Sequence, residues 1–206
     1  MQPVGEFTRI PLAAGVNLHL HHIAQYKTIR VDICISEQLR PQRNSRLALI
    51  SRLLERGTRA LPDLQSLNRF IDDLYGAHYY AEVDRLGEYQ FIHLCLEVID
   101  EKFLDRTSGD VLARGVKFLR EVLLAPAGDG RGFRREYLEQ EKRILAQHIA
   151  DRINDKMAYA QQRCVEEMCR GESIALSPWG NPEDFSAIDG EELLILTEDE
   201  ILAIIN

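Results

Sequence analysis

The sequence predicts an α+β protein with helices packed on one side of a mixed, mostly antiparallel sheet. Strand-like and helix-like patterns fall in separate blocks, in the order three strands, two helices, two strands and then helices, which is typical of this class. Hydrophobic residues make up 45% of the 206 residues, so the chain can bury one sizeable core. The length is enough for one large domain or two small ones, and we expect a single domain over residues 1–206.

The first third of the chain alternates between apolar and polar residues in three segments, EFTRIPL, AAGVNLHLHHI and YKTIRVDICIS. This alternation predicts strands, because successive side chains of a strand point to opposite faces. In the third segment, the apolar side chains on one face are Ile29, Val31, Ile33 and Ile35. Cys34 in this segment and Cys95 in the later run IHLCLEV are expected to be small core residues.

The segment RLALISRLLERGT predicts the first helix. Its apolar residues recur at helical spacing and are Leu47, Ile50, Leu53 and Leu54. Asn44 or Ser45 is the expected amino-terminal cap. We expect the helix to reach about Arg56, with Gly57 at the C′ position that ends it.

A second helix is predicted between Pro62–Asp63 and Gly76, because a proline and a capping residue precede it and a glycine follows it. Its apolar stripe consists of Leu64, Leu67, Phe70, Ile71 and Leu74. Two alternating segments, AHYYAEVD and YQFIHLCLEVI, come next. They flank RLGE, whose composition is typical of a hairpin turn.

The rest of the chain is predicted to be mostly helical. We expect one helix from about Lys102 to Leu124, then the loop APAGDGRG, and then a long helix over roughly 133–170 that bends near INDK. The closing segment TEDEILAIIN has the pattern of a capped helix, in which Thr197 and Glu200 form a capping box.

Charge and cysteine content exclude several classes of function. The chain has 33 acidic and 25 basic residues, and it lacks the basic patch that nucleic acid or an anionic membrane requires. Its four cysteines lack the spacing of a zinc or redox motif. The pattern of a signal peptide is missing, and no apolar run reaches membrane length. These features favour a cytoplasmic protein.

The candidate metal ligands form no complete site in the sequence. His19 and His21 share one face of a predicted strand, whereas His22 points to the other face. An H-x-H pair needs a third ligand and an open position, so a solvated strand face is the simpler interpretation. The carboxylates of EYLEQEK, Glu141 among them, are likewise expected on a solvated helical face.

The order of these patterns resembles the amino-terminal half of an M16-type metallopeptidase, the family of insulinase, pitrilysin and the processing peptidases. The matching features are a strand-rich start, a helix ending in RGT, then P-D, a helix ending in DDLYGA, two strands, and a later E-x-E-K-x-I-L-x-x-x-I. The resemblance extends from about Glu6 to Asn206 and implies the LuxS/MPP-like fold.

In active members of this family, the first helix carries the zinc motif H-x-x-E-H ahead of Gly-Thr. Counting back from Gly57 and Thr58, the resemblance assigns the motif positions to Ala48, Ser51 and Arg52. Alanine has no ligand atom, serine has no carboxylate to accept a proton from water, and arginine has no free lone pair. The resemblance therefore implies a scaffold without its zinc chemistry.

The third zinc ligand of the family lies on the later helix, seven residues after another glutamate. If Glu141 is that first glutamate, the ligand position falls on His148. One remaining ligand does not make a zinc site, so we expect no cofactor, although zinc is expected in active relatives.

The combination R-G-T … P-D … DDLYGA is closer to one inactive branch, the M16-like proteins named as EF-P 5-aminopentanol modification-associated. This resemblance implies a non-catalytic subunit whose partners are a catalytic M16-like protein, its own carboxy-terminal half and extended peptides. Two alternatives stay open. One is an active metallopeptidase with unconventional ligands, either His148 with Glu141 or His19 with His21, and the other is a plain protein-interaction module.

Overall fold

The computed structural model describes residues 7–13, 15–105, 109–128, 132–190 and 193. The predicted order of strands and helices is confirmed. The strands are β1 (Thr8–Ala13), β2 (Val16–Leu20), β3 (Thr28–Gln38), β4 (His78–Leu86) and β5 (Tyr89–Ile99). The α-helices are α1 (Arg43–Leu54), α2 (Leu64–Asp72), α3 (Val111–Leu124), α4 (Arg135–Asp151) and α5 (Lys156–Met168). Short 3-10 helices are η1 (Glu101–Phe103), η2 (Arg152–Asn154), η3 (Ser173–Ala175) and η4 (Pro182–Ala187).

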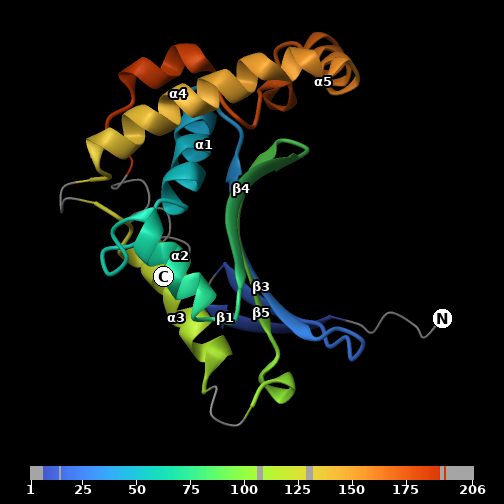
Figure 1. The fold of residues 1–206 in the computed structure, drawn as a ribbon. Helices are drawn as coiled ribbons and strands as arrows, with labels where there is room; N and C mark the ends of the chain where they lie inside the picture. The colour runs from blue at the N-terminus through green and yellow to red at the C-terminus, as the bar shows by residue number, and fades with distance from the viewer. Residues whose placement is uncertain (1–6, 14, 106–108, 129–131, 191–192, 194–206) are drawn as a thin grey trace.

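The main sheet has three antiparallel strands in the order β3-β5-β4, with β5 in the centre. Within the described residues, β1 and β2 pair only with each other and form a separate hairpin. Figure 1 shows α1, α2 and α3 on one side of the main sheet, as the sequence predicts, and none of these three helices lies on the other side, which we call the open side. The hairpin predicted at RLGE joins β4 to β5, where Gly87 has a φ of 60°.

Alternation along β3 places its predicted apolar face against the core, and the residues of that face are Ile29, Val31, Ile33 and Ile35. The prediction that Cys34 is a core residue is wrong, because Cys34 is exposed whereas Cys95 is buried. Cys34 pairs with His93 on the open side of the sheet. Cys95 faces this same side, since it pairs with Asp32 of β3 and Tyr80 of β4, yet it is buried. Alternation therefore sets the face of each cysteine, and the neighbouring side chains set its burial.

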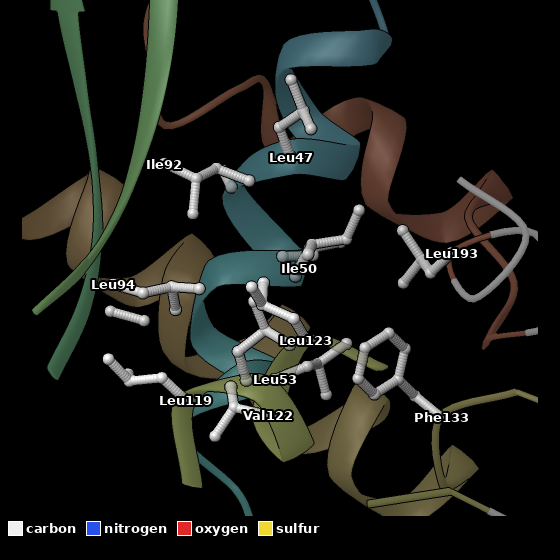
Figure 2. Packing of buried hydrophobic residues seen from close by; sticks show 14 of the residues in the cluster. Leu47, Ile50, Leu53, Ile92, Leu94, Leu119, Val122, Leu123, Phe133 and Leu193 are labelled. Atoms are coloured by element: carbon white, nitrogen blue, oxygen red, sulfur yellow. The ribbon is translucent and has the colours of Figure 1, made fainter. Parts of the chain in front are cut away.

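Helix α1 lies at the centre of the core. In Figure 2 its side chains Leu47, Ile50 and Leu53 lie between the β5 residues Ile92 and Leu94 and residues of α3. The opposite side of α1, which carries Ala48 and Ser51, is also covered, so the helix is buried almost all round. A helix without a solvated face is held by packing on every side, which is why it shows only a weak amphipathic pattern.

The predicted cap of α1 is wrong. The helix begins at Arg43 after Gln42, and Asn44 and Ser45 lie inside its first turn. Both are buried and bond to the chain after α5: Asn44 Nδ2 donates to the Ser177 carbonyl at 2.7 Å. Ser45 Oγ donates to the Asp184 carboxylate at 2.8 Å. Their polar side chains thus stabilise a tertiary contact rather than the helix end.

Other helix boundaries also differ from prediction. The helix expected from Lys102 begins only at Val111, and Lys102 lies in the short η1 turn. The expected bend near INDK is confirmed, since η2 separates α4 from α5 and Asp155 caps α5 by accepting a hydrogen bond from the Ala158 N–H. The predicted helix with Thr197 and Glu200 lies outside the described residues.

The Gly57–Thr58 junction ties the end of α1 to the segment after α3. Gly57 has a φ of 126°, and a Cβ there would lie 2.2 Å from the Leu61 carbonyl oxygen. Thr58 is fully buried, and its backbone N–H donates to the same Leu61 oxygen at 2.9 Å. The Gly57 carbonyl in turn accepts a hydrogen bond from the Ala127 N–H at 3.1 Å. Only glycine fits at this close approach.

We predict that Gly57→Ala lowers the free energy of unfolding by about 3 kcal/mol, because the new methyl group meets backbone and the φ is strained. Gly87→Ala is the matched control, since Gly87 also has a positive φ but nothing lies within 4 Å of its would-be Cβ. The control should cost only about 1 kcal/mol. Urea unfolding of both variants measures the difference, and equal losses would contradict this account of the junction.

Candidate functional site

The residues that the resemblance assigns to the zinc motif positions of α1 are Ala48, Ser51 and Arg52. Ala48 and Ser51 are 1% and 2% exposed, respectively. Ser51 Oγ donates a hydrogen bond to the Ala48 carbonyl at 3.0 Å, so the hydroxyl is satisfied within the helix. This side of the helix is therefore closed by packing, without an ionisable group at either position.

Arg52 extends from α1 to α4. Its Nε donates to Glu141 Oε2 at 2.5 Å, and the Arg52 side chain is partly exposed whereas that of Glu141 is only 3% exposed. Arg56, one turn further along, donates from Nε to Glu141 Oε1 at 2.6 Å and also forms an ion pair with this oxygen through Nη2. We call these three side chains the Arg–Glu–Arg cluster. Its two arginines satisfy both oxygens of one buried carboxylate.

The prediction of a solvated face is wrong for Glu141, which is buried in this cluster. Its neighbour Glu139 does follow the prediction, because it is half exposed and pairs with Lys142 at 2.8 Å. His148 lies on α4 two turns beyond Glu141 and is exposed. Arg52 therefore meets Glu141, and His148 forms no part of the cluster.

Glu55 and Tyr79 border the cluster on the side of β4. Glu55 Oε1 accepts a hydrogen bond from the Ala81 N–H at 3.0 Å. Burial raises the pKa of the Glu55 carboxyl, and the Ala81 hydrogen bond and the nearby Arg52 offset only part of this shift. The Tyr79 hydroxyl donates to the Leu54 carbonyl at 3.1 Å, and burial raises the pKa of this phenol above its usual range. Both side chains tie the end of α1 to β4.

Among the described residues, no group of three or more histidine, cysteine, aspartate or glutamate side chains is arranged to hold a metal ion. His19 lies on β2, and His21, just after it, stacks on the Phe7 ring with centroids 4.7 Å apart. Sequence reasoning missed Arg56 and Glu55 as members of the site region. The i, i+4 spacing of Arg52 and Arg56 was the available signal, since it places both guanidinium groups on one helical face.

A search against protein-family models finds no match for this chain. A comparison with curated proteins finds a relative that is 33% identical over 180 residues, the "Probable inactive metalloprotease YmfF" of Bacillus subtilis strain 168. The matched region is 87% of this chain but only 42% of that protein. The chain thus spans less than half the length of the curated relative.

Solved structures share the fold. A conserved protein from Enterococcus faecalis V583 superposes with a TM-score of 0.85 at 23% identity, over 95% of this chain and 46% of that one. A peptidase M16 inactive domain from Pseudomonas fluorescens gives a TM-score of 0.68 at 13% identity, over 93% of this chain and 43% of that one. At these identities the similarity establishes the fold alone.

The fold is that of one half of an M16-type peptidase. Together with the curated relative, the comparisons support the predicted inactive M16-like family, matched over the amino-terminal half only. The chain is an M16 metalloendopeptidase homologue whose sequence contains no H-x-x-E-H motif. The assignment of Ala48, Ser51, Arg52 and His148 to the motif positions stays a prediction.

None of the helices in the described part of the chain is long and apolar enough to cross a membrane.

We predict that Glu141→Gln lowers the free energy of unfolding by about 3 kcal/mol, because it leaves two arginines without their shared buried carboxylate. Glu139→Gln is the matched control on the same helix and should change stability by less than about 0.5 kcal/mol, since surface ion pairs contribute little. Urea unfolding at neutral pH measures both values. A loss in Glu141→Gln no larger than that of the control would show that the cluster contributes nothing to stability.

We predict that Glu55→Gln is at least as stable as the original chain at neutral pH. Burial raises the pKa of Glu55, so the folded protein binds this proton more tightly than the unfolded chain does. The free energy of unfolding therefore falls as the pH rises from the pKa of the unfolded chain to the higher pKa of the folded protein. Glutamine keeps an oxygen for the Ala81 N–H and removes this dependence. Urea unfolding from about pH 4 to about pH 8 should show the variant gaining relative stability with pH. If Glu55→Gln instead lost stability relative to the original chain as the pH rises, the pKa of Glu55 would be lowered rather than raised by folding.

Proposed function

We propose that this chain is the non-catalytic component of an M16-like assembly, in which it helps to enclose a peptide-binding chamber together with a catalytic M16-like partner. The observation that carries the proposal is the Arg–Glu–Arg cluster. A guanidinium group stands where the resemblance places the second zinc-binding histidine, and it is already paired with a buried carboxylate.

The chemistry of the cluster supports inactivity. An arginine has five N–H donors and no lone pair to give to a metal, and its positive charge repels a dication. Ser51 offers no carboxylate for water activation, and its hydroxyl donates within the helix. General-base catalysis needs a positioned proton acceptor, and neither Arg52 nor Ser51 supplies one.

The rival proposal, an active peptidase with unconventional ligands, fits the geometry less well. Both oxygens of Glu141 accept hydrogen bonds from Arg52 and Arg56, so this carboxylate would have to lose two charged partners to bind a metal ion. His148, its proposed co-ligand, lies two turns away along α4. The pair His19 and His21 lies in the β1–β2 region, away from the cluster.

The proposed ligands are extended peptides, which can add a strand to the edge of a sheet. Within the described residues β4 is an edge strand of the main sheet. Glu55 accepts the outward N–H of Ala81, and Asp84 accepts that of Arg85 at 2.7 Å. These side chains protect the edge against indiscriminate pairing, and a peptide would displace them.

The proposed partners follow from chain length and charge. Because the chain spans about 42% of its curated relative, a second half is proposed to cover the surface that an isolated half exposes. The net charge of -8 argues against nucleic acid or a membrane as partner. All four cysteines are free thiols, which is consistent with the proposed cytoplasmic, bacterial setting. The plain interaction module remains the second candidate, and it would bind no extended peptide.

We predict that the chain, purified without chelator, contains far less than one zinc ion per molecule and cleaves no unstructured peptide, alone or with added zinc. Metal analysis by mass spectrometry and a peptide-cleavage assay measure both properties, with an M16 protein that retains H-x-x-E-H as positive control. Mixing the full-length form with that catalytic protein should give a complex in size-exclusion chromatography. About one zinc per chain together with cleavage would overturn the inactive assignment. Failure to form any complex would contradict the proposal that the chain assembles with a catalytic M16-like protein.

A further inference from the structure

A pocket of about 180 Å³ lies beside the end of β4, outside the Arg–Glu–Arg cluster. It is bordered by Asp84 and Arg85 of the edge strand, by Arg152 of η2, by Gln162 of α5 and by Trp179. Segments far apart in the chain therefore meet here, and every residue that borders the pocket belongs to the described part of the chain. The pocket thus lies beside the end of β4, an edge strand of the main sheet within the described residues.

Arg152 is one of the two cations that border this pocket, the other being Arg85. Its guanidinium carbon lies 3.7 Å from the centroid of the Trp179 ring, a close cation–π stack. Its Nε is buried without a hydrogen-bond partner, and no ion pair to Arg152 occurs among the described residues. Burial lowers the pKa of this guanidinium, although Asp155 and Glu166 partly offset the effect. Bound anionic oxygens would replace the water that this cation has lost.

The carboxylates nearby are already engaged. Asp155 accepts from the Ala158 N–H at 3.0 Å as the cap of α5. Glu166 accepts hydrogen bonds from the Gln162 side chain at 2.7 Å and from Arg163 at 2.5 Å. Asp84 accepts from the Arg85 N–H at 2.7 Å. Each of these groups already has a donor of its own, so Arg152 can bind a further carboxylate without breaking an existing ion pair.

The other cation, Arg85, is not available in the same way. Its Nη1 donates to the carbonyl oxygen of Leu176 at 3.1 Å and also to that of Ile174. Arg85 thus fixes the η3 segment against the end of β4. Arg152 is left as the side chain of the pocket that can receive an anion.

The side chain of Gln162 also has a polar atom without a hydrogen-bond partner. Its Nε2 donates to Glu166, which fixes the orientation of the amide because a carboxylate cannot donate. Its Oε1 is buried and lacks a partner. The same pocket is therefore bordered by a donor group and by an acceptor atom that lack partners among the described residues.

We propose that this pocket binds a carboxylate of an extended peptide, with the Arg152 guanidinium donating to the carboxylate and Gln162 Oε1 accepting a backbone N–H of the same peptide. The inference rests on the proposed binding of extended peptides and specifies where their charge is recognised. A peptide carboxyl terminus and an acidic side chain both supply this chemistry, because each has a carboxylate within a few bonds of a backbone N–H.

The overall charge of the chain opposes the binding of a peptide that carries a carboxylate. The chain has a net charge of -8, which disfavours the approach of anionic peptides in general. A measured preference for a carboxylate over its neutral amide therefore has to come from a local site. Trp179 is the single tryptophan of the chain and stacks on Arg152, so its fluorescence reports directly on the pocket.

The test uses three acetylated peptides that share one valine- and threonine-rich extended sequence. The first has a free carboxyl terminus, the second is amidated, and the third is amidated with one internal glutamate. Binding is followed by Trp179 fluorescence and by calorimetry. At least one carboxylate peptide should bind about tenfold more tightly than the neutral peptide, as expected for a charged hydrogen bond, and Arg152→Gln should abolish the difference. Arg120→Gln, an exposed arginine on α3, removes the same charge outside the pocket and should preserve it.

The peptide that binds more tightly identifies the source of the carboxylate, since the first reports on a carboxyl terminus and the third on a side chain. Equal affinity for all three peptides, or a preference that survives Arg152→Gln, would overturn the carboxylate site and leave peptide binding intact. If no peptide binds in either assay, both this inference and the proposed peptide-binding function fail. Circular dichroism of each variant confirms that the fold is retained.

Discussion

The carboxylate of Glu141 joins the two helices on which the site region is built. It lies almost out of reach of solvent and accepts hydrogen bonds from Arg52 and Arg56, both on the last two turns of α1 or just beyond them. Removing one partner of such a buried pair costs about 3–5 kcal/mol, a large share of the roughly 5–15 kcal/mol that stabilises a typical domain. The crossing of α1 and α4 therefore depends on a charge arrangement as well as on apolar packing.

The end of α1 is fixed at the same time by the backbone. Gly57 lets the chain turn against the Leu61 carbonyl, and Thr58 is buried within this turn. The Ala81 N–H and the Tyr79 hydroxyl then tie the end of α1 to β4. The last turns of the helix are thus held from three directions. These contacts involve backbone groups, apolar packing and the Arg–Glu–Arg cluster, so the rigidity of this helix end does not depend on a bound metal ion.

Periodicity in the sequence was sufficient to predict the order of the elements, the inward face of β3 and the bend before α5. It failed where tertiary contacts override a local preference. Asn44 and Ser45 have the side chains of helix caps, yet they bond to Ser177 and Asp184, more than a hundred residues away. Cys34 lies in an apolar run but faces outward, and Glu141 lies in a charged segment but is buried. No local pattern encodes such long-range partners, so the Arg–Glu–Arg cluster could not be derived from spacing alone.

Two arginines of this region illustrate how the same residue can have opposite consequences. Arg52 forms its ion pair with Glu141 inside the fold, and this pair joins α1 to α4. Arg152 stacks on Trp179 and forms no ion pair with the described residues, and we propose that a carboxylate from a bound peptide pairs with it. A partly desolvated cation without an ion pair costs some stability, and a bound anion would offset that cost. The proposed loss of zinc chemistry at Arg52 and the proposed recognition of a carboxylate at Arg152 are therefore compatible, since a protein that does not cleave peptides can still bind them.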